Sequence, residues 1–191
     1  MKLETRTANI HDELIEACRR NDRKAQLQLY KNYYKAMYNT AFRILRNSAE
    51  AEDVMQEAFL AAFKKIDEYK GDASFGAWLK RIVVNKSLDE LKKKKELVSI
   101  DEKEILIEDN GQEENYLEIL SYKIEQIRQG IEELADDDRV IISLFLLEGY
   151  DHEEIAQVLN ISYGASRTRY SRARQKLREM LGRESIDKFV N

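Results

Sequence analysis

Side chains that can recognise DNA bases are concentrated between residues 163 and 183. This segment contains seven Arg or Lys residues, and Glu179 is its only acid. Arginine can donate two hydrogen bonds to guanine, while serine and threonine hydroxyls can donate or accept one. At helical spacing, Thr168, Ser171 and Arg172 point away from an apolar side of the segment. These side chains could therefore recognise a nucleic acid through non-covalent contacts.

Two helices joined by a short turn would position these side chains. Asp151 and Glu154 have the spacing of a capping box, so a first helix is expected to begin after Asp151. Asn160 tolerates a left-handed turn, and Ser162 is a good cap for the following helix. Residues 150–181 thus predict a helix-turn-helix. An Arg-rich amphipathic helix alone would equally suit a solvated surface, and the preceding helix and turn favour DNA.

In a helix-turn-helix the N-terminal half of the second helix reads bases, and later Arg and Lys residues meet phosphates. The residues predicted to read bases are Arg167, Thr168, Ser171 and Arg172. Arg174 and Lys176 follow on the same helix as further predicted DNA contacts.

A second polar surface is predicted on a helix from residue 75 to about 95. Phe75, Leu79, Ile82 and Val83 are expected to bury one side. The adjacent stripe consists of Trp78, Arg81, Asn85, Asp89 and Lys92. A row of polar side chains beside a core can be a surface that recognises nucleic acid. The alternative is a purely structural helix with a buried Trp and a solvated Lys-rich end. The preceding segment, 67–74, is expected to be a loop in which Tyr69 and Lys70 offer an aromatic and basic platform for single-stranded DNA.

Residues 49–66 predict an amphipathic helix with an acidic ridge near its N-terminal end. The ridge consists of Glu50, Glu52, Asp53, Gln56 and Glu57. Acids in the first turns also stabilise the helix dipole, so the residues alone favour a solvated face.

Composition favours an all-α protein, because the 191 residues include no proline, only seven glycines and 36% charged residues. The single cysteine, Cys18, excludes an internal disulfide framework and suits a reducing cytoplasm. His11 and His152 lack partner spacing for zinc, and no metal or cofactor is expected. No apolar run approaches the length of a membrane span or a signal peptide, so an intracellular protein without membrane insertion is expected. The net charge of −4 hides a segregated distribution, with basic blocks separated by acids.

The run EEIAQVLNISYGASRTRYSRARQKLR resembles the promoter-reading domain of bacterial sigma factors of the extracytoplasmic-function group. Arg169, Arg172, Ala173 and Arg174 match the pattern, whereas Asn160 stands where Gly is usual and Thr168 replaces Ser. The pattern F-x-x-WL-x-x-I-x-x-N-x-x-x-D at 75–89 resembles the element of the same family that reads the promoter −10 region. Lys92 replaces the usual Arg there, which weakens the case for a bidentate contact.

The resemblance implies partners that the residues alone do not. The pattern ED-x-x-QE-x-F resembles the family segment that docks on the clamp helices of the largest subunit of core RNA polymerase. Carried over, Asp53, Gln56 and Glu57 would be polar contacts to the polymerase, and Phe59 and Leu60 would be core residues or apolar contacts to it. The loop at 67–74 would help to hold a base flipped out of the melted non-template strand, and the helix at 163–181 would read duplex promoter DNA at −35. Members of this group are commonly held inactive by an anti-sigma factor.

We therefore predict an alternative sigma factor with two small helical domains. The domain at 9–95 would bind core polymerase and −10 DNA, and the domain at 117–182 would read −35 DNA. Residues 96–116 would form an acidic linker, since nine acids between Glu96 and Tyr122 face a single Lys. A stand-alone helix-turn-helix regulator is the main alternative, although no dimerisation heptad is visible. An enzyme is not expected, because no nucleophile–base pair, metal cluster or phosphate loop is present.

Overall fold

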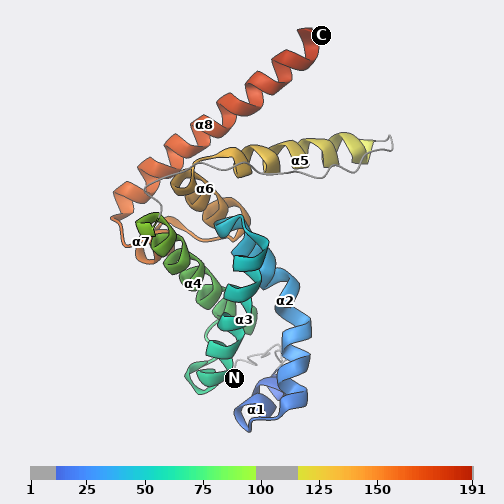
Figure 1. Cartoon of the computed structure of the whole chain (residues 1–191), viewed down its shortest axis with the longest axis vertical. Coiled ribbons are helices and arrows are strands. Elements are labelled where there is room, and N and C mark those ends of the chain that lie inside the picture. The colour runs from blue at the N-terminus through green and yellow to red at the C-terminus, as the bar shows by residue number, and fades with distance from the viewer. Residues whose placement is uncertain (1–11, 98–115, 191) are drawn as a thin grey trace, which may run out of the picture. The chain divides into compact units, whose positions relative to one another are not determined.

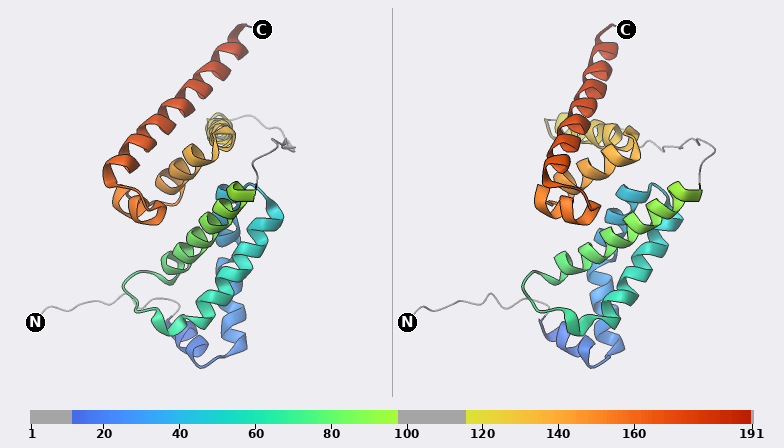
Figure 2. Two further views of the ribbon diagram at one scale, coloured as in Figure 1. Left: turned by 60° about the vertical axis from the view of Figure 1, so that its left-hand side comes forward. Right: turned by 90° about the vertical axis from the view of Figure 1, so that its left-hand side faces the viewer.

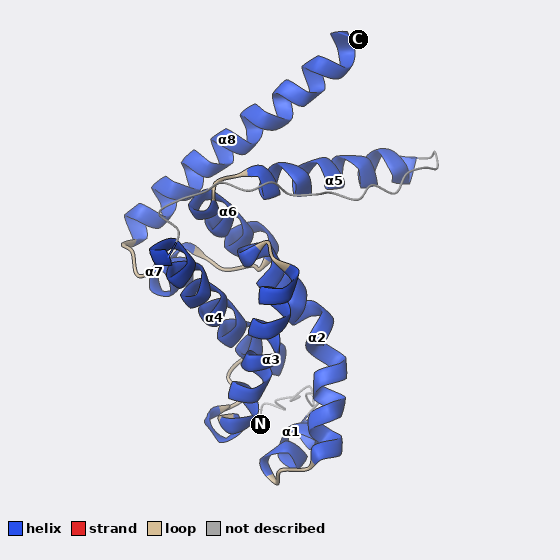
Figure 3. Ribbon diagram, viewed as in Figure 1, coloured by secondary structure: helices blue, strands red, loops and turns tan. Residues whose placement is uncertain are grey.

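The structure is a computed structural model that describes residues 12–97 and 116–190 (Figure 1). The chain divides into two compact units, unit 1 over residues 1–94 and unit 2 over residues 95–191. Every regular element in the described ranges is helical (Figure 3), which confirms the predicted all-α class. Most of the predicted acidic linker, residues 98–115, and the first residues of the predicted domain at 9–95, residues 9–11, lie outside the described residues.

The described part of unit 1 contains four α-helices and one short 3-10 helix, and Figure 2 shows the α-helices from two further sides. Their bounds are α1 Asp12–Arg19, α2 Arg23–Leu45, α3 Ser48–Lys64, η1 Ile66–Glu68 and α4 Phe75–Leu97. The helix starts follow local chemistry: the Asp22 carboxylate accepts from the backbone N–H groups of Lys24 and Ala25, and the Asn47 side chain accepts from that of Glu50. These bonds fix the N-terminal ends of α2 and α3.

The core of unit 1 is built from one side of each long helix. Leu29 and Ile44 of α2, Ala58 of α3 and Leu79 and Val83 of α4 are almost completely buried. The four tyrosines of α2, Tyr30, Tyr33, Tyr34 and Tyr38, are all half-buried. Tyr30 lies against Phe59 of α3, with ring centroids 4.9 Å apart. Tyr33 lies against Phe75 of α4 at 5.6 Å, so two of these rings join α2 to its neighbours.

Unit 2 contains α5 Tyr116–Glu133, α6 Asp136–Ile142, the π-helical turn η2 Ser143–Leu147, α7 His152–Leu159 and α8 Tyr163–Val190. Its core includes Ile141, Leu144 and Ile155, which are fully buried, and Ala173 and Leu177 of α8. Gly149 ends the α6–η2 segment with a φ of 77°, the left-handed conformation that glycine adopts without strain.

Two features of the α6–η2 segment depend on the fold. No aspartate caps α6, because the cap residue is Ala135 and makes no side-chain hydrogen bond. Asp136 instead pairs with the buried Arg139, 2.7 Å away, and Asp138 pairs with Lys176 of α8. The apolar side chains of the segment are also not all buried, since Leu146 and Leu147 in the π-helical turn are 48% and 39% exposed. The wider π turn rotates the last two leucines away from the side that packs.

Candidate nucleic-acid interface

The helix-turn-helix forms as the sequence predicts. Asp151 accepts from the backbone N–H groups of Glu153 and Glu154, and the Glu154 side chain accepts from the backbone N–H of Asp151, which completes the capping box. Asn160 adopts a φ of 52°, and the Ser162 hydroxyl accepts from the backbone N–H of Ala165 at 3.1 Å. The turn between α7 and α8 is therefore fixed by local hydrogen bonds at both of its ends.

The predicted base-reading residues share the exposed face at the start of α8. Arg167, Thr168, Ser171 and Arg172 are all exposed. The opposite face packs on the unit through Ser166, Ala173 and Leu177, which are buried. The Thr168 hydroxyl donates to the carbonyl of Gly164 at 2.9 Å, so its oxygen remains able to accept from a base. Arg167 lies over the Tyr163 ring with 5.9 Å from the guanidinium carbon to the ring centroid.

The two later DNA candidates on α8 differ from each other. Arg174 is exposed. Lys176 donates to the Asp138 carboxylate of α6, which is only 17% exposed. Lys176 therefore fastens α8 to α6 in this structure, and a phosphate would have to compete with that carboxylate.

An aromatic cluster holds the two helices of the motif together. The His152 ring stacks on Phe145, with centroids 4.8 Å apart, and meets Tyr170 edge-on at 5.4 Å. His152 Nδ1 lies 3.1 Å from the hydroxyl of the buried Ser166. Nothing in the sequence pattern had singled out His152 for this contact, because Phe145 and Tyr170 reach it only in the folded unit.

Replacing Asp151 by alanine is expected to destabilise the folded protein by about 1 kcal/mol. The substitution leaves the backbone N–H groups of Glu153 and Glu154 without their side-chain acceptor. Urea unfolding of the full chain measures the loss. Asp151→Asn, which keeps a capping oxygen, should retain most of the stability, and an equal loss in both variants would contradict a capping role.

The polar stripe predicted on α4 is exposed apart from its first residue. Arg81, Asn85, Asp89 and Lys92 are all exposed. Trp78 is half-buried, with its ring 5.5 Å from that of Tyr69 and 5.7 Å from that of Phe75. Trp78 thus links the stripe to the core of unit 1, so both interpretations offered for this helix hold in part.

The structure corrects the role predicted for Tyr69. Its side chain is only 5% exposed, its hydroxyl donates to the carbonyl of Ala73 at 2.7 Å, and its ring packs between Phe75 and Trp78. The ring is therefore not available to stack on DNA as predicted, because the loop folds back over the start of α4. Lys70 is exposed beside it.

The fold also supplies a contact to this loop that the sequence did not reveal. Arg19 at the end of α1 donates to the backbone carbonyl of Tyr69 at 2.7 Å. Because the two residues are 50 positions apart in sequence, no local pattern could have paired them. Arg19 and the Tyr69 hydroxyl together hold the loop in place.

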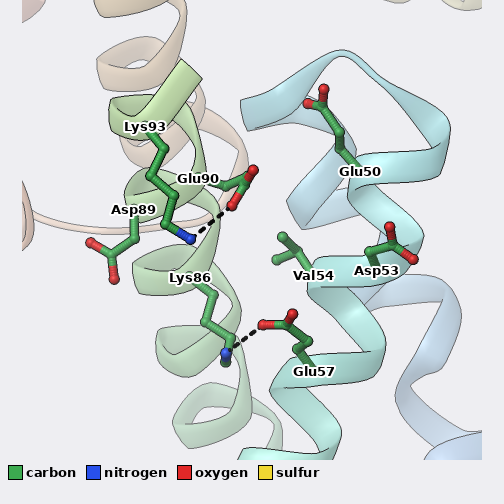
Figure 4. A pocket seen from close by; sticks show the side chains of 8 residues that line it. All are labelled: Glu50, Asp53, Val54, Glu57, Lys86, Asp89, Glu90 and Lys93. Carbon is green, nitrogen blue, oxygen red and sulfur yellow. Dashed lines mark hydrogen bonds and ion pairs between the residues drawn. The ribbon is translucent and has the colours of Figure 1, made fainter. Parts of the chain in front are cut away.

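The acidic ridge of α3 faces α4 across a groove of about 490 Å³ (Figure 4). Its lining combines acids and lysines of both helices, namely Glu50, Asp53, Val54, Glu57, Lys86, Asp89, Glu90 and Lys93. Lys86 donates to Glu57 at 2.8 Å, Lys94 donates to Glu50 at 2.9 Å, and Lys93 donates to Glu90 at 3.1 Å. The hydrogen bond from Lys86 lowers the pKa of the Glu57 carboxyl, and the hydrogen bond to Glu90 raises the pKa of Lys93.

The residues of α3 predicted to contact the polymerase separate into two groups. Asp53, Gln56 and Glu57 are exposed, and Leu60 is 61% exposed. Phe59 is only 2% exposed and packs on Tyr30 and Phe63. Phe59 is therefore a core residue, which is one of the two roles expected for it, and it is removed from the predicted polymerase contacts.

Replacing Glu57 by glutamine is expected to lower the free energy of unfolding by less than about 1 kcal/mol at neutral pH, because the side chains of Lys86 and Glu57 are 32% and 64% exposed. The folded-state pKa of Glu57 lies below its ordinary 4.5. The contribution is therefore present above that value and lost as pH falls through the folded-state pKa. Urea unfolding between pH 7 and pH 3 should show the difference between wild type and variant vanish in acid. Glu52→Gln is the control, since Glu52 accepts from Gln56 and not from a lysine.

Comparisons with known proteins agree with this geometry. Residues 29–96 match the family model of sigma-70 region 2, and residues 124–177 match that of sigma-70 region 4. The chain is 30% identical over 177 residues to the ECF RNA polymerase sigma factor SigW of Bacillus subtilis, covering 87% of this chain and 94% of SigW. The chain belongs to the extracytoplasmic-function group of RNA polymerase sigma factors.

One further relative supports the same family, and one solved structure supports the fold. The ECF RNA polymerase sigma-E factor of Escherichia coli is 30% identical over 173 residues, covering 86% of this chain and 90% of the relative. The solved structure of the sigma factor RpoE in complex with the anti-sigma factor NepR from Bartonella quintana shares the fold, with a TM-score of 0.60 at 23% identity, covering 81% of this chain and 95% of RpoE. The function of this sigma factor is promoter recognition in transcription initiation, and its partners are core RNA polymerase and promoter DNA.

The region 2 match of this sigma factor spans α3, the loop after η1 and most of α4, and the region 4 match spans the helix-turn-helix. Among the residues that the structure describes, no group of His, Cys, Asp and Glu is arranged to hold a metal ion. In the same part of the chain, no helix combines the length and apolarity that a membrane crossing requires.

Proposed function

We propose that the exposed part of the α3 ridge, Asp53, Gln56, Glu57 and Leu60, docks this sigma factor on the clamp helices of the largest polymerase subunit. The observation that carries this assignment is the position of the ridge. Its acids are exposed along α3, yet they line the same groove as Lys86 and Asp89 of the helix that carries the −10 stripe. A surface that holds the polymerase thus borders the surface that meets DNA.

We propose further that α4 and the preceding loop receive the melted non-template strand of the −10 region. The exposed stripe Arg81, Asn85, Asp89 and Lys92 offers donors, an acceptor and two cations, and Lys70 adds a cation from the loop. Tyr69 and Arg19 act here by holding the loop and not by touching DNA. The exposed start of α8 reads the −35 major groove.

Three further proposals complete this function. The sigma factor does no covalent chemistry, because its predicted contacts are all non-covalent. It acts in the cytoplasm, where core polymerase and promoter DNA are found. An anti-sigma factor holds it inactive, and this proposal is supported by the structural neighbour RpoE, which was solved in complex with an anti-sigma factor.

Run-off transcription from a promoter library, with core RNA polymerase and with or without the sigma factor, tests the function. We expect initiation at a shared two-box motif that depends on the protein. The variant Asp53→Ala with Gln56→Ala should lose most of this activity. The control Glu13→Ala with Gln26→Ala removes one exposed acid and one half-buried amide of the same unit, both outside the α3 ridge.

Two other outcomes would contradict the proposal. If both double variants retain wild-type transcription, the α3 ridge is not the docking surface. If the protein binds promoter DNA tightly without polymerase and never stimulates transcription, it acts as a stand-alone helix-turn-helix regulator.

A further inference from the structure

The second helix of unit 1 has a charge that the mechanism proposed above does not use. Between residues 23 and 49 the sequence contains six Arg or Lys residues and neither Asp nor Glu. The whole chain, by contrast, has 36 acids against 32 Arg and Lys residues and a net charge of −4. The helix α2 is therefore a cationic element in an acidic protein.

The cations of α2 form a stripe on its exposed face. Lys24, Lys31 and Lys35 are all exposed and recur at helical spacing, with exposed Gln28 and Asn39 on the same line. Among the side chains that the structure describes, none of these three lysines has an ion-pair partner, and the polar neighbour Gln28 donates to Asn32.

Three lysines of α4 are in a different state. Lys86, Lys93 and Lys94 each donate to a carboxylate within unit 1. A cation that its own chain neutralises contributes little field beyond a Debye length of about 8 Å in physiological salt. The stripe of α2 keeps its full charge and so provides the stronger attraction for an anion.

Aromatic rings run beside the lysines of α2. Tyr30 stacks on Tyr34 with ring centroids 5.6 Å apart, and Tyr38 stacks on Phe42 at 6.0 Å. All four rings are half-buried, so each also presents part of its surface to solvent. Tyr34 and Tyr38 lie at helical spacing from Lys31 and Lys35, so rings and cations share one face.

Cations interleaved with aromatic rings bind a single nucleic-acid strand through its two parts. The lysines meet phosphates, while the rings meet bases that are not hidden in a duplex. A lipid surface fits this face less well, because the amides Gln28, Asn32 and Asn39 occupy it and Leu27 is its one large exposed aliphatic residue.

We propose that the exposed face of α2, defined by Lys24, Lys31, Tyr34, Lys35 and Tyr38, binds single-stranded DNA without sequence preference. The source is the melted promoter strand, because initiation is the step at which this protein meets single-stranded DNA. In the open complex this face would be a second binding site for the melted strand, separate from the −10 stripe of α4.

Binding of the full chain to a fluorescein-labelled 15-nucleotide single strand without promoter sequence tests the proposal. Replacing Lys31 and Lys35 by glutamine is expected to weaken binding about tenfold at low salt. Each lost phosphate contact lowers the steepness of log K against log salt by about 0.7, so two lost contacts lower it by about 1.4. Tyr34→Leu with Tyr38→Leu should weaken binding of the single strand and leave the salt dependence unchanged.

The control variant is Lys65→Gln with Arg128→Gln. It also removes two positive charges, but from exposed side chains outside α2 that pair with Glu68 and Glu125. It should bind like wild type. Equal weakening in both variants would assign the effect to net charge and overturn the proposal.

Three parallel probes separate the proposed ligand from others. Duplex DNA of the same sequence should bind more weakly and lose little on replacing the tyrosines. If a single-stranded RNA of the same sequence binds much more tightly than the DNA, or if phosphatidylglycerol vesicles bind through this face and the oligonucleotides do not, the assignment to DNA is overturned. Because the probes lack promoter sequence, failure here leaves promoter recognition by α4 and α8 untouched.

Discussion

Transcription from a promoter that depends on its −35 element is expected to fall about 10- to 100-fold when Arg172 is replaced by alanine, because a bidentate contact to guanine is worth about 1–3 kcal/mol. Arg172 is exposed near the start of α8. Among the described side chains it has no ion-pair partner, so its guanidinium is free to meet a base. Initiation rates from matched promoters with and without the −35 element measure the effect.

Two variants separate base readout from simple charge. Arg172→Lys keeps the charge and loses the planar fork, so it should recover only a small part of the activity. Arg178 is also exposed but lies later on α8, where it makes a long hydrogen bond of 3.5 Å to Gln175. Arg178→Ala should cost little. Equal losses for Arg172→Ala and Arg178→Ala, with unchanged promoter preference, would show that α8 does not read bases from its N-terminal half.

The features that the sequence predicted best are those that neighbouring residues determine. The capping box of Asp151 and Glu154, the left-handed Asn160 and the cap Ser162 involve residues within a few positions of one another. Such bonds form in any helix with those residues at its ends, so the pattern alone is sufficient. The exposed and buried sides of α8 follow in the same way from its helical period.

The features that were mispredicted depend on packing between distant segments. Tyr69 has the type of a DNA-stacking residue, but Phe75, Trp78 and the bond from Arg19 bury it. For Phe59 the sequence left a core role and a docking contact open, and its packing on Tyr30 of α2 decides for the core. In both cases an aromatic ring gains more by leaving water than by staying exposed, and its partners lie 6 to 50 positions away or on another helix.

Charge on the helix surfaces shows the same limit. The sequence places Lys86 and Lys93 in a basic block, but the fold pairs Lys86 with Glu57, which is 29 positions away. Lys24, Lys31 and Lys35 of α2, in contrast, have no ion-pair partner among the described side chains. Which cations are available to DNA is therefore a property of the fold, and composition alone does not determine it.

Replacing Ile155 by alanine is expected to destabilise the helix-turn-helix by about 2–5 kcal/mol, since truncating a buried isoleucine loses its transfer free energy and leaves a cavity. The Ile155 side chain is completely buried and is the one buried residue of α7. A small domain is stable by only about 5–15 kcal/mol, so this loss is a large part of the total. Hydrogen exchange of the α7 and α8 backbone amides measures the loss locally, and activity at −35-dependent promoters should fall with it.

Exposed and half-buried residues of the same unit provide the controls. Val158 of α7 is half-buried, so Val158→Ala should cost clearly less than Ile155→Ala. Leu146 is 48% exposed, and Leu146→Ala should change stability by no more than about 0.5 kcal/mol. If Ile155→Ala and Leu146→Ala have equal effects, α7 is not held by its buried face. The recognition helix would then depend mainly on its contacts with α5 and α6, because the short helix before it would contribute little to its position.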